Sequence, residues 1–296
     1  MTLNIATDRK ANVVGTLWMI AAMAVFAIED AFLKIASASL PVGQILIVFG
    51  FGGAAVFACV ISLKGEPLFT KDVASKPMQV RVISEVIGRL FYTLAIVFTP
   101  LSSVTVILQA APLVVVAGAS FVFGEKVGWR RWSAILIGLL GVIIIVQPGT
   151  NQFSILSVLA VLGMIGFAGR DLASRAAPSS LSTSILGLYG FLSIVIAGAL
   201  YTFWEGDRFI FPDAFTLICL LGATAAGVTA YSCLMKAMRV GEVSAVTPFR
   251  YSRLLFGLTL GVMIFDEELS ATTVLESVLI VFSGLFILWR GKALVN

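Results

Sequence analysis

Residues 244–265 read Ser244-Ala-Val-Thr-Pro-Phe-Arg250-Tyr251-Ser-Arg253-Leu-Leu-Phe-Gly-Leu-Thr-Leu-Gly-Val-Met-Ile-Phe265. This is an apolar segment of membrane-spanning length with two arginines about a third of the way along it. A charged side chain at that depth costs roughly 2.5–3.5 kcal/mol on insertion scales, so it is seldom exposed to lipid. Arg250 and Arg253 are three residues apart and share one face of a helix. The sequence therefore predicts a polar interior, which the rest of the chain must enclose.

The composition of the chain indicates a polytopic membrane protein. Of its 296 residues, 59% are hydrophobic and 12% are charged, whereas about a quarter of the residues of a soluble domain are charged. The absence of histidine excludes His-ligated metal sites and His-based catalytic triads. Cys59, Cys219 and Cys233 stand singly in apolar runs, which is typical of small buried side chains and not of a disulfide framework or a metal site. We expect no metal, no cofactor and no nucleic-acid partner.

Windows of about 20 apolar residues predict an all-α protein with ten transmembrane helices. The connections between them are short and contain Pro, Gly or paired acidic residues. We expect one group of five helices in residues 1–149 and a second in residues 150–296. The predicted helices are 12–36, 42–63, 79–98, 101–123, 131–147, 153–174, 181–203, 214–238, 244–265 and 272–290.

The distribution of basic residues predicts the orientation of these helices. Alternate connections, starting with the N-terminus, hold fifteen basic residues, and the opposite side holds only Lys34 and Arg208. The positive-inside rule then places both termini in the cytoplasm. The fifteen are Arg9, Lys10, Lys64, Lys71, Lys76, Arg81, Lys126, Arg130, Arg131, Arg170, Arg175, Lys236, Arg239, Arg290 and Lys292.

An internal repeat relates the two halves. Phe26-Ala-Ile-Glu-Asp30-Ala-Phe-Leu-Lys34 aligns with Phe167-Ala-Gly-Arg-Asp171-Leu-Ala-Ser-Arg175 at an offset of 141 residues. Phe123-Gly-Glu125 aligns with Phe265-Asp-Glu267 at an offset of 142. Five helices is an odd number, so the second copy must enter the membrane from the opposite side. The sequence therefore predicts two inverted repeats, an architecture of many secondary transporters, with a substrate site at the repeat interface.

The two five-helix halves, each with a fourth helix that ends in Phe-x-Glu, resemble the EamA-type members of the drug/metabolite transporter superfamily. The resemblance covers nearly the whole chain, and it looks nearest to the YddG group of aromatic amino-acid exporters of bacterial inner membranes, which implies the same location for this chain. It implies ten helices around a central cavity whose exposure alternates between cytoplasm and periplasm. The diffuse family pattern specifies the fold much better than the substrate.

Charged residues in the inner half of the membrane are candidates for a gate. Arg89 lies one turn after Glu85 in the third predicted helix, at a depth comparable to that of Arg250 and Arg253. A fixed charge network that also includes Asp171 is one interpretation. A gate whose ion pairs form and break during transport is the second, and direct recognition of a substrate carboxylate is the third.

Two acidic residues of the first predicted helix admit two interpretations. Glu29 and Asp30 lie in the outer half of the membrane, with Lys34 one turn beyond Asp30. The spacing of Asp30 and Lys34 suits an ion pair at a solvated helix end. Alternatively, one of the two carboxylates couples proton movement to transport.

Near the predicted midplane, Gln109 and its repeat mate Tyr251 can hydrogen-bond a zwitterionic substrate or a neighbouring helix. Five aromatic residues could line a cavity for a ring-bearing substrate, although ordinary packing explains them equally. These are Trp18, Phe26, Tyr92, Tyr231 and Phe249.

The sequence thus predicts a secondary transporter, not an enzyme, that exports small metabolites by alternating access, with amino acids, aromatic and other neutral ones, as the expected substrates. Export of another metabolite or drug class is the alternative. A passive channel and an intramembrane enzyme that uses acidic residues are the competing classes. The absence of a Walker-type phosphate loop argues against ATP as the energy source. The expected partners are the substrate and membrane lipid, and a monomer is compatible with the sequence.

Overall fold

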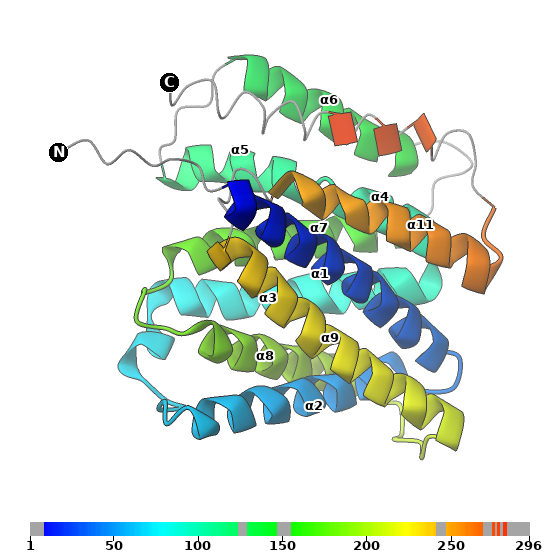
Figure 1. Cartoon of the computed structure of the whole chain (residues 1–296). Coiled ribbons are helices and arrows are strands. Elements are labelled where there is room, and N and C mark those ends of the chain that lie inside the picture. Colours follow the sequence, from blue (N-terminus) through cyan, green and yellow to red (C-terminus); the bar gives the residue numbers. More distant parts are fainter. Residues whose placement is uncertain are drawn as a thin grey trace.

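The computed structural model describes residues 9–123, 129–146, 155–240, 247–268, 274–275, 277–278 and 281–282. In these residues the chain is an all-helical bundle whose long helices run side by side (Figure 1). The elements are α1 (Arg9–Ala36), α2 (Val42–Leu63), η1 (Lys71–Ala74), α3 (Lys76–Phe98), α4 (Leu101–Leu108), α5 (Ala111–Phe123), α6 (Trp129–Val146), α7 (Ile155–Ala176), α8 (Thr183–Glu205), α9 (Ala214–Val240), η2 (Thr247–Tyr251) and α11 (Ser252–Phe265).

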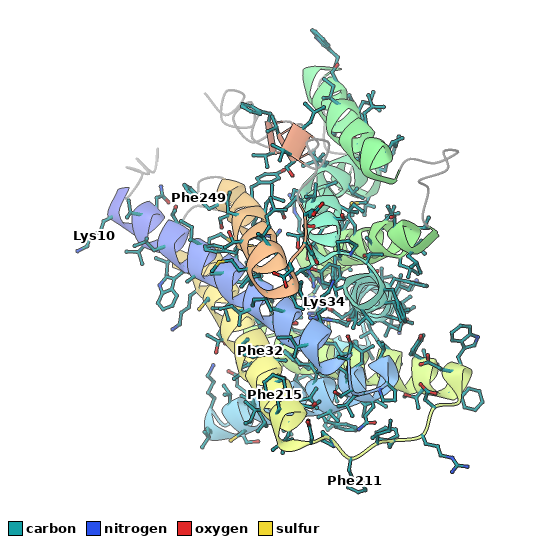
Figure 2. All side chains as sticks on the ribbon, turned by 90° about the vertical axis from the view of Figure 1, so that its right-hand side faces the viewer. Lys10, Phe32, Lys34, Phe211, Phe215 and Phe249 are labelled. Atoms are coloured by element: carbon teal, nitrogen blue, oxygen red, sulfur yellow. The ribbon has the colours of Figure 1, made fainter. Side chains whose placement is uncertain are left out.

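Nine of the ten predicted segments are helical in the described residues, and the tenth, 272–290, lies largely outside them. Six helical stretches there are long and apolar enough to cross a membrane, counting α4 and α5 as one. Helix α3 is not among the six, because Arg81, Glu85 and Arg89 interrupt its apolar sequence. Large apolar side chains cover the outside of the bundle, and Phe211, which is fully exposed, points away from it (Figure 2).

Local sequence explains where the helices begin and end. The hydroxyl of Ser182 accepts a hydrogen bond from the backbone N–H of Ile185 and caps the first turn of α8. Helix α8 ends at Gly206, whose φ of 75° is a left-handed conformation that glycine adopts without steric cost. Asp213 accepts a hydrogen bond from the N–H of Thr216 and starts α9 in the same way as Ser182 starts α8.

The contacts between helices divide the bundle into interlocked pairs. The most extensive contacts join α3 to α7, α1 to α9 and α2 to α8. Glycine permits the close approach of α3 and α7: a Cβ on Gly166 would collide with the backbone of Gly88, and one on Gly163 would lie 2.8 Å from the backbone nitrogen of Tyr92. Each pair combines a helix from residues 1–149 with one from residues 150–296.

Successive connections between the helices lie at opposite ends of the bundle, which are named here after Lys34 and Lys64. At the Lys34 end, the side-chain amide of Gln44, at the start of α2, bonds both backbone groups of Ile210, just before α9. At the Lys64 end, Glu66 accepts a hydrogen bond from Ser182, at the start of α8. Helices α1 and α3 therefore finish at the Lys34 end, where α2, α4 and α9 begin, and α2 finishes at the Lys64 end, where α3 and α8 begin.

Two of the predicted helices depart from regular α-helix at equivalent places in the described residues. The predicted helix 101–123 breaks after Leu108, and α5 begins at Ala111. Pro112 explains this break, because it has no N–H for a helical hydrogen bond. The predicted helix 244–265 begins, in the described residues, with the 3-10 turn η2, which contains Pro248. The two breaks lie 141 to 142 residues apart, the offset of the sequence repeat.

Candidate functional site

Helix α3 carries a stripe of buried polar side chains. Arg81, Glu85, Arg89 and Tyr92 follow one another at intervals of three or four residues, so they lie on one face of the helix. Buried charges are stable only when they are paired and hydrogen-bonded. The stripe finds its partners on α1, α7 and α11, in two clusters.

The first cluster, the α1 cluster, consists of Glu29, Asp30, Arg89, Tyr92 and Arg253. Arg89 donates to Glu29 at 2.7 Å, and Arg253 donates to Asp30 at 2.6 Å. The hydroxyl of Tyr92 donates to the same Asp30 oxygen at 2.9 Å. The side chains of Glu29 and Asp30 are each only 1% exposed. Two carboxylates balance two guanidinium groups, and their short bonds fasten α1 to α3 and α11.

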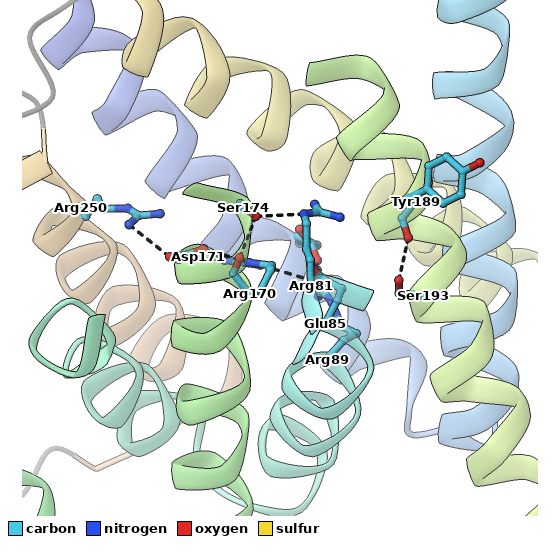
Figure 3. A network of polar contacts seen from close by, with 10 residues as sticks. Arg81, Glu85, Arg89, Arg170, Asp171, Ser174, Tyr189, Ser193 and Arg250 are labelled. Carbon is cyan, nitrogen blue, oxygen red and sulfur yellow. Dashed lines mark hydrogen bonds and ion pairs between the residues drawn. The ribbon is translucent and has the colours of Figure 1, made fainter. Parts of the chain in front are cut away.

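The second cluster, the α7 cluster, consists of Arg81, Glu85, Arg170, Asp171 and Arg250 (Figure 3). Arg170 pairs with its neighbour Asp171 at 2.8 Å and reaches Glu85 of α3 at 3.5 Å. Arg250 of η2 reaches Asp171 at 3.5 Å. About a quarter of each side chain of Arg170, Asp171 and Arg250 is exposed. The ion pairs between helices are therefore longer and wetter here than in the α1 cluster.

Arg81 is buried deeply in the α7 cluster, with 2% of the residue exposed. Its Nε donates to the hydroxyl of Ser174 at 2.9 Å, and that hydroxyl donates to the carbonyl of Arg170 at 2.7 Å. Among the described residues, no carboxylate lies within 4 Å of its guanidinium group. The cluster thus holds three guanidinium groups against two carboxylates.

The assignment of Arg81 and Arg170 to cytoplasmic connections was wrong, because both side chains turn into the bundle. Their i, i+4 spacing to Glu85 and to Ser174 places each on one helix face with a polar neighbour, but it does not show whether that face is enclosed. Without them the basic residues still divide thirteen to two, so the predicted orientation does not depend on them.

The prediction of a solvated pair between Asp30 and Lys34 was also wrong. Asp30 binds Tyr92 and Arg253 in the core, and Glu29 binds Arg89. Because α1 is packed against α9 and α11, its acidic face is enclosed and does not reach the aqueous phase. Helical spacing alone does not distinguish an exposed face from an enclosed one.

The predicted gate residues all belong to the two clusters, but not with the expected partners. Arg89 pairs with Glu29 and not with Glu85, which binds Arg170 instead. Asp171 does pair with Arg250, whereas Arg253 pairs with Asp30. The reason is that α1 contributes two carboxylates to the core, which compete for the arginines of α3 and α11.

Lys34 takes part in a contact that closes the Lys34 end. Its ammonium group donates to the carbonyl of Thr99 at 2.7 Å and to Glu267 at 3.3 Å. Glu267 also accepts the backbone N–H groups of Leu101 and Ser102 at 2.5 and 2.9 Å, at the start of α4. Partial burial would raise the pKa of Glu267, but these N–H donors and Lys34 outweigh it and hold the pKa below its usual value.

Gln109 lies where α4 ends. Its side-chain amide donates to the backbone carbonyl of Arg250 at 3.3 Å, so the end of α4 is bonded to η2. Its repeat mate Tyr251 is also buried, and its hydroxyl has no hydrogen-bond partner among the described residues. Of the two interpretations of Gln109, the contact with a neighbouring element is the one that this conformation contains.

The predicted aromatic residues do not form a single lining. The rings of Phe26 and Tyr92 lie 5.1 and 5.7 Å from the guanidinium group of Arg253. Tyr231 lies within electrostatic range of four members of the α7 cluster and packs edge-on against Phe57. Trp18 packs instead against Lys236, and Phe249 is 39% exposed.

Comparison with known proteins identifies the class of this chain. Residues 13–147 match the EamA-like transporter family. An S-adenosylmethionine uptake transporter of Rickettsia prowazekii is 25% identical over 69% of both chains. A riboflavin transporter of Vibrio cholerae is 27% identical over 94% of both chains. A pseudopaline exporter of Pseudomonas aeruginosa is 24% identical over 90% of this chain and 93% of its own.

A solved crystal structure shares the fold, with a TM-score of 0.60 and 19% identity over 93% of this chain and 96% of the other. The three relatives named above and the matching family are transporters, which confirms the prediction of a transporter instead of an enzyme. None of those named here is an aromatic amino-acid exporter, so the resemblance holds for the EamA type and not for the YddG group. The chain therefore has the helices of a multi-pass membrane protein, and its residues 13–147 match the EamA-like transporter family.

Proposed function

We propose that the chain is a secondary carrier in which two inverted halves, residues 1–149 and 150–296, rock against each other around a central substrate site. The helix pairs support this arrangement. Under the repeat, α1 corresponds to α7 and α3 corresponds to α9, so the contacts α3–α7 and α1–α9 are images of each other. The pair α2–α8 is its own image. A two-fold relation between the halves accounts for all three pairs at once.

The proposed substrate site lies where the end of α4 meets η2. Interrupted helices place free backbone groups at the membrane midplane of many carriers, where they bind substrate. Here the break between α4 and α5 meets η2 through Gln109 and Arg250, and Tyr251 brings an unpartnered hydroxyl to the same place. The hydrogen bond between Gln109, at the end of α4, and Arg250, in η2, is the single observation on which the proposal depends.

The two charge clusters have different roles in this proposal. Charge-assisted hydrogen bonds are strongest near 2.7–2.9 Å. The pairs of the α1 cluster reach 2.6 and 2.7 Å, so we assign this cluster to the part that stays assembled. The bonds of the α7 cluster to α3 and η2 are 3.5 Å long and partly hydrated. They are the gate toward the Lys64 end, which the basic residues place in the cytoplasm.

The gate toward the opposite face is the contact of Glu267 with Lys34 and the start of α4. In this conformation it closes the Lys34 end. Transport then requires that this contact opens while the α7 cluster tightens, and the reverse. No ATP-binding loop takes part, and the driving force is a gradient.

The relatives suggest the range of substrates. They are named for S-adenosylmethionine, riboflavin and pseudopaline, which share small size, polarity and at least one ring. We infer a polar, ring-bearing metabolite as the substrate of this chain. Export of aromatic amino acids falls within this class, but the named relatives do not favour it over the other members.

Transport in sealed proteoliposomes tests the carrier proposal. Labelled S-adenosylmethionine, riboflavin and phenylalanine would be offered separately to the purified protein. Saturable uptake of at least one of them, accelerated by the unlabelled compound inside the vesicle, is the expected result. Flux that rises without saturation and shows no exchange would indicate a channel and contradict the proposal.

The gate is tested by a charge swap. Asp171→Arg with Arg250→Asp restores an ion pair that either single change breaks. We expect each single variant to lower the transport rate at an unchanged protein level and the double variant to recover part of it. Full transport in both single variants would exclude Asp171 and Arg250 from the gate.

A further inference from the structure

Among the described residues, Arg81 is the one arginine of the α7 cluster with no carboxylate oxygen within 4 Å of its guanidinium nitrogens, although Oε2 of Glu85 lies near the same face of Gly190. Its Nε is held by Ser174, whereas its Nη1 is buried without any hydrogen-bond partner. A buried guanidinium group with a free donor is costly unless something binds it. Ser174 orients the group but does not neutralise it.

The surroundings of Arg81 are built for a close approach of the guanidinium group to α8. A Cβ on Gly190 would lie 3.4 Å from Nη2 of Arg81, so this glycine leaves room for the guanidinium group there. Figure 3 shows the side chain of Arg81 beside Ser174, with a dashed line joining the two. The position is buried, lies on the inner stripe of α3 and is enclosed by α7, α8 and α9.

Aromatic side chains flank this position. Gly187, which precedes Gly190 by three residues and shares its face of α8, lies against the ring of Phe57, so Phe57 and Arg81 lie over the same face of α8. Phe57 packs edge-on against Tyr231, with ring centroids 5.5 Å apart, and at a tilt against Phe191, with ring centroids 5.7 Å apart; Phe191 follows Gly190 in α8. A cationic group and a set of three aromatic rings therefore adjoin one another in the half of the bundle nearer the Lys64 end.

We propose that Arg81 binds the carboxylate of the transported metabolite, whose apolar or ring portion packs against Phe57, Phe191 and Tyr231. This inference rests on the proposed carrier function and adds a substrate class to it: small organic acids and zwitterions with a ring. A carboxylate carries one negative charge, which matches the single excess guanidinium group of the α7 cluster. A phosphate carries nearly two negative charges at neutral pH and would leave the cluster with an excess of negative charge.

The test compares probes that differ only in the carboxylate. S-adenosylmethionine would be compared with its decarboxylated form, and tryptophan with tryptamine, with riboflavin as a ring compound that has no carboxylate. For each probe, the shift of the thermal unfolding midpoint and the inhibition of uptake in proteoliposomes would be measured. The proteins are the full-length chain, Arg81→Gln, Arg81→Lys and, as a control, Lys71→Gln, which removes an exposed charge near the same end.

In the wild-type protein and in Lys71→Gln, we expect at least one acid to bind about tenfold or more tightly than its decarboxylated partner. Arg81→Gln should abolish this preference while riboflavin or another neutral probe behaves as before, and Arg81→Lys should keep part of it. A purely structural role of Arg81 would lower stability without changing the ratio between acid and decarboxylated probe.

Two results would overturn the assignment. One is an unchanged acid preference in Arg81→Gln, and the other is a wild-type protein that binds no carboxylate probe. If a neutral probe is still transported with saturation, the carrier function stands and only the role of Arg81 fails. If no probe shows saturable flux, the carrier function itself fails.

Discussion

The side-chain amide of Gln109 donates a hydrogen bond to the backbone carbonyl of Arg250 at 3.3 Å. The two residues are 141 positions apart, which is the offset of the sequence repeat; Gln109 lies where α4 ends, and Arg250 lies in the 3-10 turn η2. This bond therefore joins equivalent places of the two halves.

Gln109→Leu removes this bond while nearly keeping the side-chain volume. We expect the transport rate to fall by roughly three- to tenfold, which corresponds to the loss of one ordinary hydrogen bond. Uptake by proteoliposomes, normalised to the amount of folded protein, measures the effect. Gln79→Leu, which removes an exposed amide bonded to the carbonyl of Ala74, is the control and should leave transport unchanged. Equal rates in both variants would show that the bond has no part in transport.

The pair of Asp30 and Arg253 should contribute strongly to stability. Asp30→Asn and Arg253→Gln each leave a buried charge without its partner, which costs about 3–5 kcal/mol. The double variant should lose less than the sum of the two single losses, because it buries neither charge. Chemical unfolding in mixed micelles measures the free energies of the cycle. Asp72→Asn, at an exposed carboxylate bonded to Ser180, is the control and should change the stability little. Additive losses in the cycle would contradict a direct interaction.

Glu267 should make the closed Lys34 end sensitive to acid. Its folded pKa lies below the usual 4.5, because its N–H donors and Lys34 outweigh the effect of burial. Its contribution to stability is then fully present above pH 4.5 and is lost as the pH falls through the lowered folded value.

The measurement is the difference in unfolding free energy between the wild-type protein and Glu267→Gln as a function of pH. This difference should be constant near neutral pH and should shrink below pH 4.5. Glu268→Gln removes a neighbouring exposed charge and serves as the control. A difference that does not change across the acidic range would show that Glu267 gains nothing from its ionised form.

Gly166 should be essential for the contact of α3 with α7. A Cβ at this position would collide with the backbone of Gly88, which cannot move aside without separating the two helices. We expect Gly166→Ala to destabilise the protein by about 1–3 kcal/mol. In Gly118→Ala, the new Cβ would meet only the end of the Leu172 side chain, which can rotate away. Thermal unfolding of the two variants should therefore differ clearly, and equal midpoints would contradict the close packing of α3 and α7.

The sequence predicted much of the fold because the bilayer imposes a simple rule. A spanning helix needs about 20 apolar residues and short polar connections, so segments such as 42–63 could be delimited without any partner being known. The interruption at Pro112 has a local cause as well, since proline lacks the N–H group, but the sequence predicted one helix over 101–123. The charged residues of the site could also be selected, because arginine at membrane depth demands an enclosed position.

The pairing of these charges could not be predicted. Arg89 stands one turn from Glu85 in the sequence, but the carboxylate that it binds is that of Glu29, sixty residues away. Likewise, Lys34 binds Glu267 and not Asp30. Several partners of suitable charge exist for each arginine, and only the packing of the helices decides which of them comes within hydrogen-bond distance.

The sequence by itself thus determined that the chain is a bundle of membrane helices with a polar interior, since hydropathy and charge act along a single helix. The tertiary structure alone decided that Arg81 and Arg170 turn inward, that the α1 cluster is tight and the α7 cluster loose, and that Gln109 meets Arg250. Those facts depend on the rotation and the distance of one helix relative to another. Glycine contacts and helix breaks set this rotation and this distance. The hydrophobic and charge pattern of the sequence does not determine either of them uniquely.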